Sequence, residues 1–336
     1  MAVGLVGSPL QVFRGCDMEV ELLIQHGDKV YIPVVEEDIV WTTERAGTPG
    51  QLTFSVVKDS TINFTEGDAV RVRVDEKNLF YGFVFIKKRD KSGIIKVTAY
   101  DQLRYLKNKD TYVYENKTAG ELIQMIASDF QMQTGEIEDT GFKIASRVED
   151  NVSLFDMIQN ALDLTLQNTE SMFVMFDDFG KIALKDIANL QLNLLIDEET
   201  GENFDYTSSI DSDTYNRIKL VYDNEDTGKR EVYIAQDSKN MNEWGVLQYF
   251  DTLQKDENGK AKADALLELY NKKTRNLTIK NALGDTRVHA GTMVVAQLDL
   301  GDIKLKNMML VEKCKHTFKN DEHFMDLTLR GGEFVV

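Results

Sequence analysis

A short pattern of alternating apolar and polar residues near the start of this chain recurs near its end. Gly67–Val74 reads Gly-x-x-Val-x-Val-x-Val, and Gly291–Leu298 reads Gly-x-x-Val-x-Ala-x-Leu. Strict alternation predicts a strand with one face in a core and the other in solvent. The recurrence indicates either a duplicated β domain or a chance repetition, because β proteins often reuse short patterns.

The segments that follow the two copies are also similar, since each contains a second strand, a polar turn and a third strand. These are Phe80–Ile86, Arg89–Gly93 and Ile94–Tyr100 in the first case, and Met308–Lys313, Lys319–Glu322 and Phe324–Arg330 in the second. If the chain is duplicated, Val70–Val74 and Val294–Leu298 should occupy the same place in two related antiparallel domains.

The middle of the chain has a different, helical character. Thr118 and Glu121 form a capping box, and apolar residues follow at helical spacing. Helices are therefore predicted at about 118–130 and 153–168. A hairpin of Met172–Asp177 and Lys181–Asp186 comes next. Together these elements predict a small α/β insert.

The chain divides into three predicted parts, as expected for 336 residues. A first β domain covers 1–110, an α/β insert covers 111–195, and a second β domain covers 196–336. The second domain includes strands at 217–222 and 230–236 and is interrupted at about 241–276 by a helical insert, with its helix at about 261–275. The predicted fold class is mainly β with an α/β insert: two antiparallel β-barrel or β-sandwich domains with helix-containing insertions.

The composition excludes several classes of protein. The net charge is −17, and positions 101–200 hold 8 basic and 19 acidic residues, so a phosphate-gripping face and sequence-specific nucleic-acid binding are not expected. No apolar run approaches the roughly 18 residues of a membrane span. Cys16 and Cys314 allow one bridge at most, and a reduced pair fits a cytosolic product better.

Three motifs suggest chemistry but are explained more simply. Asp178-Phe-Gly180 spells the magnesium triplet of kinases, yet the other kinase motifs are missing, which favours a hairpin turn. Asp223–Gly228 lacks the ligands of a calcium loop and is expected to be a solvated turn. His316 and His323 could meet on neighbouring strands but lack a zinc spacing. We therefore predict no catalytic, cofactor-binding or metal-binding residues.

Longer stretches resemble a known family. The most specific are Val97-Thr-Ala-Tyr-Asp-x-Leu-Arg-Tyr-Leu106 and Met325-Asp-Leu-Thr-Leu329, and the similarity extends over about residues 20–332. They resemble the XkdQ/YqbQ-like family, which comprises hub proteins of contractile phage tails and phage-tail-like particles.

The resemblance implies a structural baseplate hub that joins the sixfold tail tube to the threefold central spike. It implies a homotrimer in which each chain supplies two tail-tube-like β domains. The implied partners are the tail tube protein, the central spike protein, other baseplate proteins and the tape measure. The implied location is the baseplate of a virion or tail-like particle, assembled in the bacterial host cytoplasm; a DNA-carrying phage and a headless bacteriocin remain equally open. Since larger relatives fuse a spike or lysozyme domain to the hub, these are expected on other chains here.

Two other functions compete with the hub: a tail-associated cell-wall-degrading enzyme and a carbohydrate-binding adhesin. The lack of a catalytic constellation favours the hub and a protein that is not an enzyme. Candidate interface residues are Trp41, Arg71, Arg73, Phe80, Phe83, Asp299 and Asp326.

The acidic balance allows two interpretations. An acidic channel would keep DNA phosphates from adhering to its wall. Alternatively, the acidic residues of 101–200 only solubilise the outer face of the insert. In the family that this chain resembles, the strands of the two β domains line the channel. The charge of the channel therefore depends on whether Arg71 and Arg73 or Asp299 and Asp326 face it.

Overall fold

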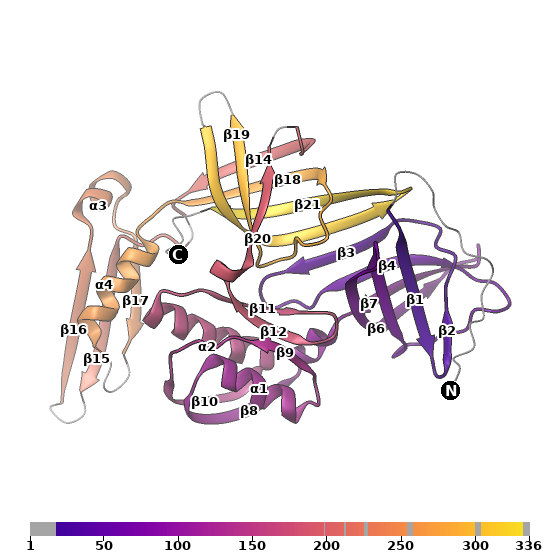
Figure 1. Ribbon diagram of the computed structural model, residues 1–336. Coiled ribbons are helices and arrows are strands. Elements are labelled where there is room, and N and C mark those ends of the chain that lie inside the picture. Colours follow the sequence, from indigo (N-terminus) through magenta and orange to yellow (C-terminus); the bar gives the residue numbers. More distant parts are fainter. Residues whose placement is uncertain are drawn as a thin grey trace.

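The computed structural model describes residues 18–197, 199–211, 213–224, 228–253, 258–299 and 304–331. Most of this backbone is antiparallel β-strand, and the longer helices lie in insertions (Figure 1). The predicted fold class, mainly β with an α/β insert, is therefore confirmed. Cys16 and the centre of the turn Asp223–Gly228 lie outside the described residues.

The first β unit comprises the strands before residue 101, drawn in indigo in Figure 1. They are β1 (Val20–His26), β2 (Lys29–Tyr31), β3 (Ile39–Glu44), β4 (Gln51–Val57), β5 (Ala69–Val74), β6 (Lys77–Arg89) and β7 (Ile94–Tyr100). β5 turns into β6 through Asp75 and Glu76, which both have positive φ, as a tight hairpin turn between twisted strands requires.

The second β unit is built from strands in the last 146 residues of the chain. They are β13 (Gln191–Ile196), β14 (Asn203–Ser209), β18 (Thr274–Leu283), β19 (Met293–Asp299), β20 (Lys304–Lys319) and β21 (Glu322–Gly331). The predicted strands at 277–282, 293–300, 308–316 and 324–330 are thus present as β18 to β21, except that position 300 lies outside the described residues.

The two units have the same strand order. In the first, the hydrogen-bonded order is β3-β4-β7-β6-β5, and in the second it is β14-β18-β21-β20-β19. Numbered along the chain over these five strands of each unit, with β1, β2 and β13 left aside, both orders are 1-2-5-4-3. Val70–Val74 and Val294–Leu298 both lie in strand 3, the place that duplication predicts for them.

A glycine and a bulge recur at matching positions. The N–H of Gly67 donates to the carbonyl of Val84, and the N–H of Gly291 donates to that of Val311, each at 2.8 Å. Both glycines have φ above +90°, a conformation that other residues rarely adopt. The residue after Val84 and the residue after Val311, Phe85 and Glu312, are each the site of a register shift against strand 5. A repeated strand pattern does not by itself require the same glycine conformation and the same bulge, so we interpret the pattern as a duplication.

The two units share one continuous sheet. β3 of the first unit pairs with the C-terminal half of β20 of the second, which joins them in a sheet of 13 strands within the described residues. Each unit keeps its own apolar core on that sheet.

The α/β insert lies below the sheet in the view of Figure 1. The predicted helices are present as α1 (Ala119–Asp129), with its capping box at Thr118, and α2 (Leu154–Thr169). The remaining elements are η1 (Gln102–Lys107), β8 (Lys109–Lys117), β9 (Thr134–Ile137), β10 (Ile144–Ser153), β11 (Phe173–Asp177), β12 (Ile182–Asp186) and η2 (Ile187–Leu190). The helices bury one face each against these strands in a separate core.

A second insertion separates β14 from β18 and lies to the left in Figure 1. It contains β15 (Arg217–Asn224), β16 (Lys229–Gln236), α3 (Ser238–Trp244), β17 (Gln248–Thr252) and α4 (Gly259–Tyr270). β15 and β16, which the sequence analysis placed in the second β domain, instead form their own sheet with β17. α4 packs on this sheet around Leu220 and Leu266. A strand pattern predicts a strand but not its partner, which explains the difference.

Candidate assembly interface

The two β units meet where β3 runs antiparallel to β20. Paired residues extend from Lys313 opposite Glu44 to Phe318 opposite Ile39. Phe318 lies on a strand of the second unit but is buried in the core of the first. Burial of such apolar side chains contributes most to holding two sheet edges together.

Side chains reinforce the junction at its centre and at one end. The rings of Trp41 and His316 stack with their centroids 4.9 Å apart. Just beyond β3, Arg45 Nε donates to the carboxylate of Glu312 at 2.7 Å, and both side chains are largely shielded from solvent. The junction thus combines main-chain pairing, ring stacking and a shielded ion pair.

A chain of hydrogen bonds fixes the His316 ring. Its Nε2 lies 2.7 Å from the carbonyl of Val288, and its Nδ1 lies 2.8 Å from Nε2 of His323. Because a carbonyl only accepts, Nε2 of His316 carries the proton and Nδ1 accepts from His323. Burial lowers the pKa of His316 to about 3 and that of His323 to about 4. Both rings are therefore neutral near pH 7. The lone pair on Nδ1 of His316, which a metal ion would need, is already used to accept the hydrogen bond from His323.

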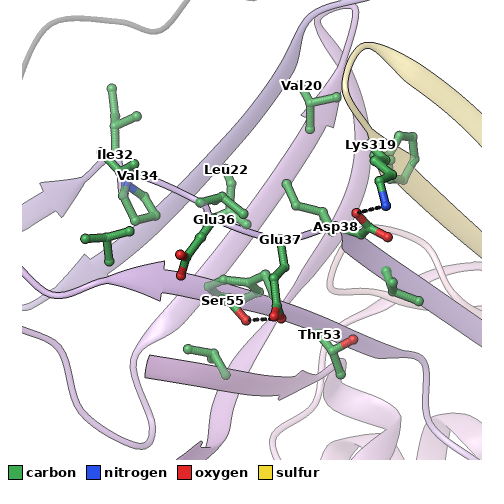
Figure 2. Close-up of a pocket in the computed structure, with 18 of the residues that line it drawn as sticks. Val20, Leu22, Ile32, Val34, Glu36, Glu37, Asp38, Thr53, Ser55 and Lys319 are labelled. Carbon is green, nitrogen blue, oxygen red and sulfur yellow. Dashed lines mark hydrogen bonds and ion pairs between the residues drawn. The ribbon is translucent and has the colours of Figure 1, made fainter. Parts of the chain in front are cut away.

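A cavity of about 900 Å³ opens beside the junction (Figure 2). Its apolar lining includes Val20, Leu22, Ile32 and Val34. Asp38 pairs with Lys319 at 3.4 Å, and Glu37 accepts a hydrogen bond from Ser55 at 2.8 Å. That bond and the nearby Lys96 keep the pKa of Glu37 below its usual range. A general acid needs a raised pKa, so Glu37 is unsuited to that role.

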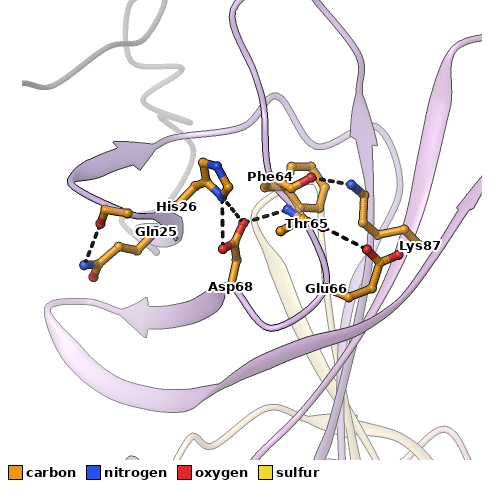
Figure 3. A network of polar contacts seen from close by, with 8 residues as sticks. Gln25, His26, Phe64, Thr65, Glu66, Asp68 and Lys87 are labelled. Atoms are coloured by element: carbon orange, nitrogen blue, oxygen red, sulfur yellow. Dashed lines mark hydrogen bonds and ion pairs between the residues drawn. The ribbon is translucent and has the colours of Figure 1, made fainter.

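A polar network holds the loop before β5 (Figure 3). Nδ1 of His26 lies 2.8 Å from the carboxylate of Asp68, which also accepts the N–H of Thr65 at 2.6 Å. Lys87 of β6 donates to the carbonyl of Phe64 and lies over that ring. The network ties β1, the loop and the C-terminal part of β6 together, so that this edge of the first unit is well fixed.

Two carboxyl groups are shielded between the first unit and the α/β insert. Asp101 accepts from the N–H groups of Gly50 at 2.7 Å and Leu103 at 3.0 Å, and Asp177 accepts from Gly180 at 2.7 Å. Burial raises the pKa of both, that of Asp177 to about 7, and the Asp177 charge adds to the effect on Asp101. Within the described part of the chain they belong to no cluster of three or more potential metal ligands.

The kinase-like triplet is a turn, as the sequence analysis predicts. The N–H of Asp178 donates to the carbonyl of Lys181 at 2.7 Å, and Gly180 has φ +85°. The triplet therefore closes the β11–β12 hairpin.

Two of the predicted interface residues are not available to a partner. Phe80 is buried in the core of the first unit, which corrects its assignment, because the strand β6 turns this side chain inward. Trp41 is buried as well, and its contact is the junction within the chain.

The other five candidates do not form one surface. Arg71, Arg73 and Phe83 lie on β5 and β6, whereas Asp299 lies on β19 and Asp326 on β21. Several already have partners within the chain: Arg71 with Gln25, Arg73 with Asn78, and Asp326 with Lys280 and Lys315. Their role at an interface stays a prediction.

Sequence reasoning missed the sheet edges of β6 and β14. β14 carries polar residues at most positions, so it shows little of the apolar alternation that identifies a strand. Phe204 and Ile86 are large apolar side chains that the structure leaves exposed at these edges, where a cover is needed, but the sequence alone does not show their exposure.

Comparisons with known proteins agree with this architecture. A protein-family model described as YQBQ-like matches residues 39–330. Two relatives from Bacillus subtilis strain 168 are each 31% identical to this chain. The match covers 88% of this chain and 92% of the uncharacterized protein YqbQ, and 89% of this chain and 94% of the phage-like element PBSX protein XkdQ.

A solved structure has a similar fold. It is the 43 kDa tail protein of prophage MuSo2 from Shewanella oneidensis, with a TM-score of 0.65 over 93% of this chain and 96% of that one. The sequence identity is 11%, so this likeness concerns the fold alone.

Proposed function

Because this chain belongs to the YQBQ-like family, we propose that it is the structural hub of a contractile tail baseplate, joining the sixfold tail tube to the threefold central spike. The relative XkdQ is named as a protein of a phage-like element, and the fold is shared with a prophage tail protein. Both support a structural role in a tail or baseplate.

The duplication is the observation that supports the hub best. Each chain carries two β units with the same strand order, the same glycine and the same bulge. A closed ring of three chains therefore presents six similar β units on one side, while the whole assembly keeps threefold symmetry. A tube with sixfold symmetry and a spike with threefold symmetry could both dock on such a ring.

We propose partners that this geometry can accommodate. Six similar units suit the tail tube protein, the threefold face suits the central spike protein, and the inserts provide surface for other baseplate proteins. The tape measure would pass through the ring. We place the protein in the baseplate of a virion or tail-like particle, assembled in the host cytoplasm. No described helix has the length and apolar character of a membrane span.

A wall-degrading activity is the main competing function. Glycoside cleavage needs two carboxyl groups that a sugar polymer can reach. The carboxyl pair with raised pKa, Asp101 and Asp177, does not meet this need because Asp101 is buried. We propose a role that is not enzymatic. A lytic band at 38.3 kDa in zymography on purified cell walls would contradict it.

Deletion and complementation test the hub directly. Without this chain, we expect tubes that lack an attached spike, seen by negative-stain electron microscopy, and the intact gene should restore complete particles. Particles that retain tube and spike in the absence of the chain would refute the hub.

A further inference from the structure

The junction inside the chain offers a template for a junction between chains. β3 is strand 1 of the first unit, and its outer edge pairs with Lys313–Phe318 of β20, which is strand 4 of the second unit. Strand 1 of the second unit is β14, and strand 4 of the first unit is β6. Within the chain, strand 1 of one unit pairs with strand 4 of the other. If the same kind of pairing forms a second time, β14 should pair with β6.

The register of each unit shows which residues correspond. Trp41 of β3 lies opposite Leu52, and Tyr206 of β14 lies opposite Leu277. Leu52 and Leu277 both pair with strand 5 of their unit at equivalent positions. Tyr206 therefore corresponds to Trp41.

The bulges show which residues of β6 correspond to which residues of β20. Phe85 in β6 and Glu312 in β20 occupy the same place relative to strand 5. The four residues that follow them, Ile86–Arg89 and Lys313–His316, therefore correspond as well.

Both edges lack a second strand in the part of the chain that the structure describes. Ile86–Arg89 pairs with β7 on one side only, because β5 ends its pairing at Phe83. β14 pairs with β18 on one side only. Open strand edges readily pair with another chain.

Apolar exposure marks the same two edges. Ile39 of β3 is 8% exposed, because β20 covers it, whereas Phe204, its counterpart in β14, is 39% exposed. Ile86, at the open edge of β6, is 51% exposed. A second strand on each edge would cover these side chains.

We infer that β14 pairs antiparallel with Ile86–Arg89 of β6 in a neighbouring copy of this chain. The internal junction sets the register: Ile86 lies opposite Ser209, Lys88 opposite Thr207, and Arg89 opposite Tyr206. Arg89 and Tyr206 replace the pair His316 and Trp41, so a cation–π contact takes the place of the ring stack.

The charges of the two edges are complementary. Lys88, Arg89 and Lys91 are exposed at the end of β6, and Glu202 and Asp205 are exposed at β14. Opposite charges on two sheet edges favour their approach and suppress the pairing of like edges.

The contact is heterologous, since it joins two different edges, and such contacts either close into a ring or continue as a filament. This step rests on the proposed hub, in which the ring closes with three copies. The six β units are then joined alternately by a β3–β20 junction within a chain and a β14–β6 junction between chains.

Disulfide trapping in assembled particles tests the pairing. The variant carries Lys88→Cys and Thr207→Cys in a Cys16→Ser background, while the remaining Cys314 is buried. Directly opposite residues in an antiparallel pair are close enough for a disulfide. Oxidised particles should yield a covalent trimer on non-reducing gels. Co-assembly of the two single variants should yield covalent dimers only, since one molecule then supplies one edge.

Two matched pairs control the experiment. Thr42→Cys with Lys315→Cys places the same chemistry at the junction within the chain, where the residues lie opposite one another, and should give an intramolecular disulfide without a change in mass. Lys88→Cys with Ser208→Cys shifts the register by one residue, which points the two side chains to opposite faces, and should give little cross-linking.

The outcomes separate the two proposals. A ring of three chains in the particle without a covalent trimer, or equal cross-linking in the shifted register, would overturn the strand pairing and leave the hub intact. A particle that does not contain this chain would overturn the hub itself.

Discussion

The two β units are built alike, but their outer strands meet different surroundings. In the first unit β3 is covered by β20, and six residues link it to β4. In the second unit β14 has an open edge, and a whole subdomain, β15 to α4, separates it from β18. The difference indicates that strand 1 of the first unit finds its outer partner within the chain, while strand 1 of the second unit is left for a neighbouring copy.

The units also differ in their buried polar groups. Asp101 follows strand 5 of the first unit, and the matching position in the second is Gly331. The second unit instead buries His316, which is hydrogen-bonded to the partly buried His323. A shared strand order therefore tolerates different polar chemistry where each unit contacts its own insert or partner.

Replacing the corresponding aromatic residues, Trp41 and Tyr206, by alanine should reveal the largest difference in stability between the two strand edges. We expect Trp41→Ala to lower the free energy of unfolding of the isolated chain by about 3–5 kcal/mol, because it leaves a cavity at a buried junction. Tyr206→Ala should cost about 1 kcal/mol or less, since its side chain is only partly covered. Urea unfolding measures both losses, and similar losses would contradict the difference between the edges.

Alanine at the two matching glycines should have a smaller but unequal effect. Both positions have positive φ, which costs a side-chain residue about 1–3 kcal/mol. A Cβ at Gly291 would also lie 2.4 Å from Cγ1 of Val174, whereas a Cβ at Gly67 meets no atom within 4 Å. Gly291→Ala should therefore be the more destabilising by thermal unfolding. Equal melting temperatures would show that the insert does not press on the second unit at Val174.

Asp177→Asn should remove a pH dependence that arises where the α/β insert meets the first unit. The pKa of Asp177 is raised to about 7 in the folded chain, above its value of roughly 4 in an unfolded chain. The folded state thus holds the proton more tightly, and stability is lost as pH rises from about 4 through 7. We expect the variant to be more stable than the wild type at pH 8, by at least about 1 kcal/mol, and the gain to shrink at pH 5.

The control is Asp178→Asn at the exposed neighbouring position. Because the Asp178 charge contributes to the raised pKa of Asp177, this substitution should weaken the pH dependence without removing it. If Asp177→Asn stabilises the chain equally at both pH values, the ionisation of Asp177 does not contribute.

The exposed ion pair at the junction should have the smallest effect. Lys313 and Glu44 lie 2.5 Å apart, but both side chains remain more than one-third exposed. We expect Lys313→Ala to cost about 0.2–1 kcal/mol in urea unfolding at low salt. The cost should vanish in 1 M salt, where charges are screened within about 3 Å. A cost that persists in salt would mean that the Lys313 side chain contributes by packing.

The sequence predicts the parts of this fold that local physics determines. Thr118 with Glu121 caps α1, and Gly67 and Gly291 mark the two recurring strands, because each signal acts over a few residues. It does not predict that β15 and β16 leave the main sheet, or that β3 pairs with β20. Those contacts join residues far apart in the chain, and strand patterns do not specify partners.

The candidate interface was predicted less well for a related reason. Trp41 and Phe80 were chosen as large aromatics, but their burial is decided by neighbours from other strands. The open edges of β6 and β14 become visible only when the register of both units is known.

An asymmetric cryo-electron microscopy reconstruction of the baseplate tests the central claim most directly. We predict three copies of this chain between tube and spike, with their six β units at one axial level and successive units rotated by about 60°. One copy, six copies, or a ring in which only one unit of each chain surrounds the axis would contradict the account.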